Sequence, residues 1–222
     1  MGDLIEIRAA DGHRFKAWRA TPTQTSRGLV VIAPEIFGVN DHIRAVADGF
    51  AAQGYLTIAP QLFDRSEPDY EAGYEATDIA AGRAIIEDIG FDACLRDIEA
   101  CIAHVQARDA AAVVGYCWGG TIAWLAAAQV SGLRAAVAYY GGGIPAHAQS
   151  TPACPTMLHF GEQDTHPSAD EARAVVAAHP EVTAHFYQAG HGFNCDHRAS
   201  FNPEAAELAR SRTLAFLAEH LG

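Results

Sequence analysis

The chain of 222 residues is long enough for one compact domain that buries its own core without disulfides or metals. Half of its residues are hydrophobic and 19% are charged, which excludes a disordered chain, and no apolar run reaches the ~18 residues of a membrane span. The formal net charge of −12 excludes a broad basic face for nucleic acid, so an anionic substrate would need a local positive site.

Strand-like and helix-like segments alternate along the chain. Leu4–Ala9 and Phe15–Ala20 predict an opening hairpin, because Asp11-Gly12 between them is a strong turn dipeptide. Short apolar runs bounded by turn residues predict further strands at Leu29–Ala33, Tyr55–Ala59, Ala110–Val114, Leu133–Tyr140, Thr156–Phe160 and Thr183–Tyr187. Helical periodicity predicts helices over Asp41–Gln53, Cys94–Arg108, Gly119–Gln129, Ala169–Ala178 and Pro203–His220. The polar segment Gln61–Ala80 is expected to be an irregular excursion over the surface or the site.

Strands that alternate with helices need crossover connections, which produce a mostly parallel central sheet with helices on both faces. We therefore predict a single α/β domain over residues 1–222. Open sheets of this kind place their functional sites at the carboxyl ends of strands. Reactive side chains at those ends are the candidates for chemistry.

Cys117 lies in GYCWGG, residues 115–120, between a predicted strand and a predicted helix. This is the G-x-C-x-G pattern of a nucleophile elbow, with Cys in place of Ser. Glycines suit this turn because it strains the nucleophile and brings the backbones too close for a Cβ. The turn lifts the sulfur above the sheet, where the N-terminus of the next helix favours the thiolate. The alternative is a buried cysteine in a glycine-rich turn.

Asp164 and His191 follow Cys117 in the chain order nucleophile, acid, histidine, and each comes just after a predicted strand. We predict a triad in which Asp164 holds the imidazole in one tautomer and His191 carries the proton. Taken singly, Asp164 could cap a turn and His191 could be a loop histidine, but the order and context of all three favour the triad. Of the competing histidines, His159 is expected in the core or behind the site and His166 in solvent. His197 suits a substrate contact.

Glu35 follows another predicted buried strand, in PEIFGVN, residues 34–40. In an elbow enzyme, this loop and the residue after the nucleophile supply the oxyanion hole, so we assign the hole to the N–H groups of Ile36 and Trp118. A carboxylate beside Ile36 and Phe37 is unusual and makes Glu35 a candidate catalytic residue. A surface glutamate that caps the following helix is the alternative.

Five motifs occur in order along nearly the whole chain: PEIFGVN, GYCWGG, YYGGG (139–143), HFGEQD (159–164) and GHGF (190–193), followed by the tail RASFNPEAAELARSRTLAFL. With them the sequence resembles the dienelactone hydrolases, or carboxymethylenebutenolidases. The resemblance implies a single-domain α/β-hydrolase fold and hydrolysis of an enol-lactone or activated ester through a thioester acyl-enzyme. It implies a triad of Cys117, His191 and Asp164, and a thiol-activating role for Glu35 when substrate arrives.

The same resemblance implies a substrate pocket that includes Tyr140, with Phe37 beside it. Family members that act on dienelactone carry arginines for the substrate carboxylate, and here the chain departs from the pattern. The position four residues after the histidine is Cys195, and the nearest candidate for a second arginine is Arg83. Arg198 could supply the missing charge from the same loop as His191, although it could also be a solvated surface residue.

Other functions stay open at the level of sequence. A carboxylesterase or thioesterase of a different substrate class is the first alternative, and a non-catalytic binding module on the same fold is another. A metal or redox protein using Cys195, His191 and His197 is the least favoured, since no CxxC or HExxH occurs. We expect no cofactor and no metal.

The expected partner is a small-molecule lactone or ester, with no nucleic acid and no membrane. A monomer is expected, with a dimer as the alternative. The first residues lack the basic and apolar regions of a secretory signal, and five irregularly spaced cysteines do not form a disulfide framework, so a cytoplasmic location is expected. Cys94 and Cys101, seven residues apart, are expected on the buried stripe of a helix.

Overall fold

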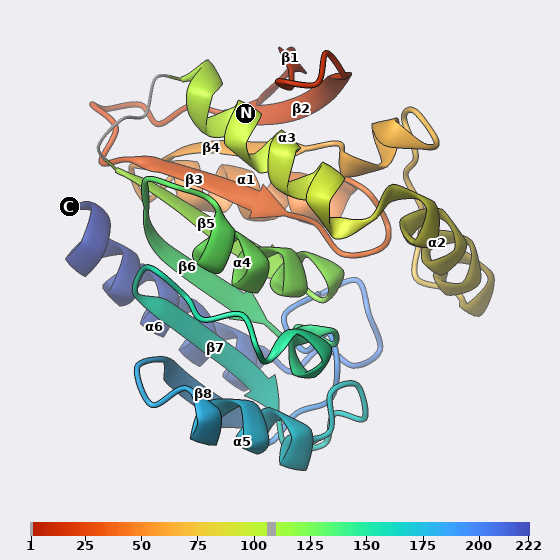
Figure 1. Ribbon diagram of the computed structural model, residues 1–222, viewed down its shortest axis with the longest axis vertical. Helices are drawn as coiled ribbons and strands as arrows, with labels where there is room; N and C mark the ends of the chain where they lie inside the picture. The colour runs from red at the N-terminus through yellow and green to blue at the C-terminus, as the bar shows by residue number, and fades with distance from the viewer. Residues whose placement is uncertain (1, 106–109) are drawn as a thin grey trace.

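One eight-stranded sheet organises the chain in the computed structural model, which describes residues 2–105 and 110–222 (Figure 1). The strands are β1 (Asp3–Arg8), β2 (Arg14–Ala20), β3 (Leu29–Ala33), β4 (Leu56–Pro60), β5 (Ala111–Tyr116), β6 (Leu133–Tyr139), β7 (Thr156–Gly161) and β8 (Thr183–Tyr187). Their order across the sheet is β1-β2-β4-β3-β5-β6-β7-β8. β2 pairs antiparallel with both β1 and β4, and the remaining pairs, from β4 to β8, are parallel. The prediction of a mostly parallel sheet is confirmed.

Helices cover both faces of this sheet (Figure 1). They are α1 (Asp41–Ala51), α2 (Ala76–Ile89), α3 (Phe91–His104), α4 (Trp118–Gln129), α5 (Ala169–Ala178) and α6 (Pro203–Leu221), with short 3₁₀ turns η1 (Leu62–Arg65) and η2 (Ile144–His147). α1 and α6 pack on one face, and α3, α4 and α5 pack on the other. β3 shows why its sequence is a continuous apolar run: Val31 faces one layer while Val30 and Ile32 face the other, and all are fully buried.

The predicted strands and most predicted helices lie within a few residues of their observed bounds. Cys94 and Cys101 are buried in α3 as expected. α3 begins at Phe91, before the predicted start, and the predicted helix end at Arg108 lies outside the described residues.

The prediction that Gln61–Ala80 is irregular is partly wrong, because this segment contains η1 and the first turn of α2. The sequence did not predict α2, because only two of its residues, Gly82 and Ile89, are buried and its helical periodicity is weak. Its N-cap is Glu75, paired with Asp78 in a capping box, which is not a usual start signal. A Cβ at Gly82 would run into the Ile36 carbonyl, so α2 approaches the loop after β3 backbone to backbone.

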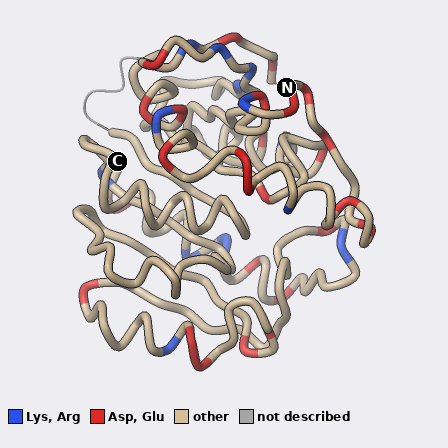
Figure 2. The backbone as a smooth tube through the Cα atoms, turned by 45° about the vertical axis from the view of Figure 1, so that its right-hand side comes forward, with Lys and Arg blue, Asp and Glu red and all other residues tan. Residues whose placement is uncertain are grey.

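Charged residues lie over the outer helices and loops, and acidic ones are spread rather than gathered in one region (Figure 2). A largely buried ion pair joins η1 to α3: Asp97 on α3 is fully enclosed and accepts two hydrogen bonds, of 2.8 and 2.7 Å, from the Arg65 guanidinium. Arg65 also reaches Asp11 in the opening hairpin, so this network joins η1 to α3 and β1–β2. No described helix combines the length and apolarity needed to cross a bilayer.

Candidate active site

Cys117 sits at the sharp turn between β5 and α4. Its backbone has φ 55° and ψ −114°, a strained conformation for a residue with a Cβ. Gly115 and Gly119 make the turn possible, because a Cβ on either would collide with a backbone carbonyl, that of Gly119 or of Ala33. The observed elbow therefore has the crowding that the sequence predicted.

The sulfur of Cys117, the imidazole of His191 and the carboxylate of Asp164 form a continuous chain of contacts. His191 Nε2 lies 3.1 Å from Cys117 Sγ, and His191 Nδ1 lies 2.9 Å from Asp164 Oδ2. The other carboxylate oxygen, Oδ1, accepts the backbone N–H of His166 at 2.8 Å. The Asp164 side chain is almost wholly buried, while His191 and Cys117 are partly exposed. The structure thus brings the three predicted residues together.

His191 is poised to carry a positive charge. Burial disfavours the charged imidazole, but the Cys117 sulfur and then the Asp164 hydrogen bond favour it more strongly. Together they raise the pKa of His191 from 6.5 to about 10. At neutral pH the arrangement therefore favours an imidazolium beside the sulfur, which is the form that can donate a proton to a leaving group.

A cavity of about 350 Å³ opens above Cys117. Its lining includes Ile36, Phe37, Arg83, Trp118, His191 and Arg198, all singled out from the sequence. Neither Ile36 nor Trp118 uses its N–H for a backbone hydrogen bond in the turns and loops that the structure describes. Both N–H groups are therefore available to an oxygen bound beside the sulfur.

Glu35 is buried, with 1% of its side chain exposed, and pairs with Arg198 rather than with Cys117. Arg198 Nη1 donates to Glu35 Oε1 at 3.0 Å, and the guanidinium lies over the rings of Phe37 and Tyr74. Arg198 is 17% exposed and reaches the cavity, so it is not a solvated surface residue. Arg83 lines the same cavity from α2.

Tyr140 lies behind the site instead of lining this cavity. It is fully buried at φ 39°, and its ring meets the His191 ring edge-on at 5.2 Å between centroids. His159 is a core residue as expected, bonded to the Tyr187 hydroxyl and to Thr213. His166 is exposed but stands at the cavity lining, and His197 lies beside His42 and Tyr74, away from this cavity.

Sequence reasoning missed the apolar wall of the cavity, which Ile79, Ile86 and Phe91 form. These residues belong to α2 and to the first turn of α3. The seven-residue spacing of Ile79 and Ile86 would place both on one face of a helix, but the polar residues of Gln61–Ala80 made that helical pattern hard to recognise. The grouping of Cys195 with His191 and His197 is also not observed: among described residues Cys195 gathers instead with Glu35 and His42.

Known proteins share the sequence pattern and the fold of this chain. The sequence model of the Dienelactone hydrolase family matches residues 15–221. Carboxymethylenebutenolidase 1 of Cupriavidus pinatubonensis is 32% identical, covering 98% of this chain and 97% of its own length. Carboxymethylenebutenolidase of Pseudomonas putida is 31% identical, covering 96% of this chain and 95% of its own length.

Solved structures share the fold over the whole chain. The "Putative Dienelactone Hydrolase" of Klebsiella pneumoniae superposes with a TM-score of 0.85 at 28% identity, covering 99% of each chain. A dienelactone hydrolase-like promiscuous phosphotriesterase from metagenomic libraries superposes with a TM-score of 0.82 at 20% identity, covering 100% of this chain and 99% of its own. Because the phosphotriesterase is only 20% identical, its likeness supports the α/β-hydrolase fold and nothing more.

Proposed function

Because the chain belongs to the dienelactone hydrolase family, a family of lactone and ester hydrolases, we propose that it opens an enol-lactone or activated ester with Cys117 as nucleophile. His191 carries the proton and Asp164 orients it. One observation carries this proposal: Sγ, the imidazole and the carboxylate lie in line at 3.1 and 2.9 Å, beneath a cavity of about 350 Å³.

The first half-reaction forms a thioester. The Cys117 thiolate attacks the carbonyl carbon, and its oxygen becomes an oxyanion held by the free N–H groups of Ile36 and Trp118. When the tetrahedral intermediate collapses, the bond to the enol oxygen breaks and the enolate takes the proton of the His191 imidazolium. The product is an acyl group on Cys117 and a neutral His191.

Water completes the cycle. Neutral His191 takes a proton from a water molecule, whose oxygen attacks the thioester carbon. Collapse expels the Cys117 thiolate and leaves the imidazolium, so the starting charges are restored. Asp164 keeps Nδ1 protonated throughout, which leaves Nε2 facing both the sulfur and the incoming water.

A cysteine nucleophile sets the class of leaving group. A thiolate is expelled more readily than an alkoxide or an amine, so the intermediate formed from an ordinary ester or amide returns to substrate. An enolate or aryloxide competes with the thiolate as a leaving group. The proposed substrates are therefore enol-lactones and activated esters.

The cavity wall suggests an anionic substituent on the substrate. Arg198 and Arg83 are the two arginines in the lining, while Ile79, Ile86 and Phe91 supply an apolar side. A substrate carboxylate that draws the Arg198 guanidinium would loosen its pair with Glu35, whose freed carboxylate then takes the proton from Cys117 in any molecule that still holds it as a thiol, which generates the attacking thiolate. That is the role we propose for Glu35. Tyr140 supports the His191 ring from behind.

The test is a substrate screen on the wild-type enzyme and on Cys117→Ser. We expect turnover of enol-lactones, faster with a carboxylate than without, and little turnover of the matched alkyl ester. Acid quenching during turnover should trap an acyl group on the Cys117 peptide, detected by mass spectrometry. If alkyl esters are cleaved as fast as enol esters, or if alkylated Cys117 leaves activity intact, the proposal is wrong. Preference for an apolar aryl ester without any carboxylate would favour the carboxylesterase alternative instead.

A further inference from the structure

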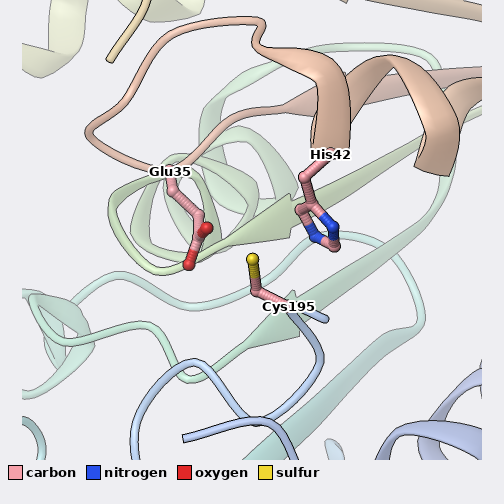
Figure 3. A group of neighbouring side chains, drawn as sticks. All are labelled: Glu35, His42 and Cys195. Carbon is pink, nitrogen blue, oxygen red and sulfur yellow. The ribbon is translucent and has the colours of Figure 1, made fainter. Parts of the chain in front are cut away.

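Three side chains that could bind a metal ion meet beside the proposed active site (Figure 3). Glu35 comes from the loop after β3, His42 from the first turn of α1, and Cys195 from the loop after β8. Each offers one potential ligand atom, and these atoms all lie within 4.8 Å of one another. The Cys195 sulfur points between the carboxylate and the imidazole ring (Figure 3).

All three side chains are buried, and two of them carry polar atoms without partners. Glu35 is 1% exposed, His42 4% and Cys195 0%. Glu35 Oε2 and His42 Nε2 have no hydrogen-bond partner among the described residues. Buried polar atoms without a partner are costly, so two unpaired acceptors in one cluster favour the binding of a proton donor or a cation between them.

His42 is already arranged as metal-binding histidines usually are. Its Nδ1 lies 2.9 Å from Asp196 Oδ1, so the ring donates its proton to that carboxylate. This contact fixes the tautomer with the lone pair on Nε2. A carboxylate–histidine pair of this kind orients the ring and makes the free nitrogen a stronger ligand.

We propose that Glu35, His42 and Cys195 form a binding site for a zinc-class divalent cation. One carboxylate, one imidazole and one thiolate are the mixed O, N and S donors that Zn²⁺ accepts. Tetrahedral bonds of about 2.0–2.3 Å require ligand atoms roughly 3.3–3.8 Å apart, which small side-chain shifts achieve from the observed cluster. Three protein ligands leave a fourth position for water.

The charges around the cluster also balance. With the ion bound, Glu35, the Cys195 thiolate and Asp196 carry three negative charges against the dication and Arg198. Without an ion, Cys195 is a fully buried thiol next to the Glu35 carboxylate. When a metal ion binds, it takes the place of the thiol proton, which leaves to solvent, as is usual for a coordinating cysteine.

Of the three cluster residues, His42 also borders a second cavity. This cavity, of about 390 Å³, is lined by His42, Asp196 and Arg210 and opens between α1 and α6. Its effect on the enzyme would run through Glu35. An ion held by Oε2 fixes the carboxylate whose Oε1 binds Arg198, and Arg198 lines the proposed substrate cavity.

The test must separate this cluster from Cys117 and His191, which could also bind a thiophilic ion. We would therefore use Cys117→Ser as the parent and titrate it with Zn²⁺ by calorimetry and with Co²⁺ by absorbance. The expected result is one ion per chain and a thiolate-to-cobalt charge-transfer band, which only a cysteine ligand produces. Absence of that band, or binding of Co²⁺ without it, overturns the proposal.

Variants in the same parent locate the site. We expect Cys195→Ser to abolish the charge-transfer band, and His42→Gln or Asp196→Asn to weaken Zn²⁺ at least about tenfold. The matched control is Cys101→Ser, another fully buried thiol, which should leave both titrations unchanged. Thermal unfolding of each variant reports folding independently. A band that survives in folded Cys195→Ser means an adventitious site only, and refutes the assignment.

Discussion

Replacing Asp164 by asparagine tests whether this carboxylate sets the tautomer of His191 in the proposed triad. In the structure Oδ1 accepts the backbone N–H of His166 at 2.8 Å, and Oδ2 faces His191 Nδ1 at 2.9 Å. The backbone N–H can only donate, so the asparagine oxygen must stay on His166. The amide N–H₂ then faces Nδ1, which must become an acceptor. Neutral His191 would therefore carry its proton on Nε2, facing the sulfur.

The expected loss follows from that tautomer. An imidazole with the proton on Nε2 cannot take a proton from the thiol or from water, and the lost carboxylate also stops stabilising the imidazolium. The same change in a Ser-His-Asp enzyme costs about 10⁴-fold in kcat. In this chain the Cys117 sulfur also stabilises the imidazolium, so part of that stabilisation survives the loss of the carboxylate. We therefore expect a loss of roughly 10²–10⁴-fold in kcat/KM, which corresponds to about 2.7–5.4 kcal/mol.

The assay is steady-state hydrolysis of an activated enol ester, together with the rate of Cys117 alkylation by iodoacetamide. Both rates should fall in Asp164→Asn. Asp170→Asn is the matched control, because its carboxylate is fully exposed at the start of α5. Circular dichroism and thermal unfolding check that the variant is folded. A folded Asp164→Asn that keeps the wild-type kcat/KM and alkylation rate would refute the reasoning.

Three further outcomes are expected. The pKa of His191 is raised from 6.5 to about 10, so the imidazolium that donates the proton persists below that pH. We therefore expect kcat/KM to fall as pH rises through about 10, and a fall near pH 6.5 in the pH profile would contradict this. Asp97→Ala removes the buried partner of Arg65 and leaves Asp11 as its remaining carboxylate partner, so it should lower the free energy of unfolding by about 3 kcal/mol in urea titrations. Glu6→Ala is the control: it breaks the exposed Arg14–Glu6 pair and should lower the same free energy by less than about 1 kcal/mol. Arg83→Gln should raise KM for carboxylate-bearing esters and leave neutral esters unchanged; equal effects on both would argue against a charge contact.

The local sequence patterns identified most of the fold. Strands buried on both faces of a parallel sheet are short and almost continuously apolar, and β3 and β5 were recognisable for that reason. The elbow was recognisable because a turn this tight demands glycine on both sides of the nucleophile. The resemblance to dienelactone hydrolases, the α/β-hydrolase fold and the class of lactone or ester hydrolase are confirmed.

The candidate triad could be predicted because each member follows a strand directly. Parallel strands carry their carboxyl ends to one edge of the sheet, so strand-end residues converge whatever the length of the crossovers between them. Cys117, Asp164 and His191 meet for that reason, and the residue pattern around each strand contained the necessary information. The catalytic roles of these residues remain predictions for the assays above.

The contacts made by the longer loops could only be decided by the tertiary structure. Arg198 meets Glu35 across 163 residues, and Cys195 meets His42 and Glu35 from another part of the chain. α2 forms a cavity wall although its own sequence is polar and weakly periodic. The physical reason is that periodicity encodes which face of an element is buried, whereas a loop's path depends on every surface it crosses. Local patterns therefore determined the sheet and its reactive edge, and only three-dimensional packing decided what surrounds the sulfur.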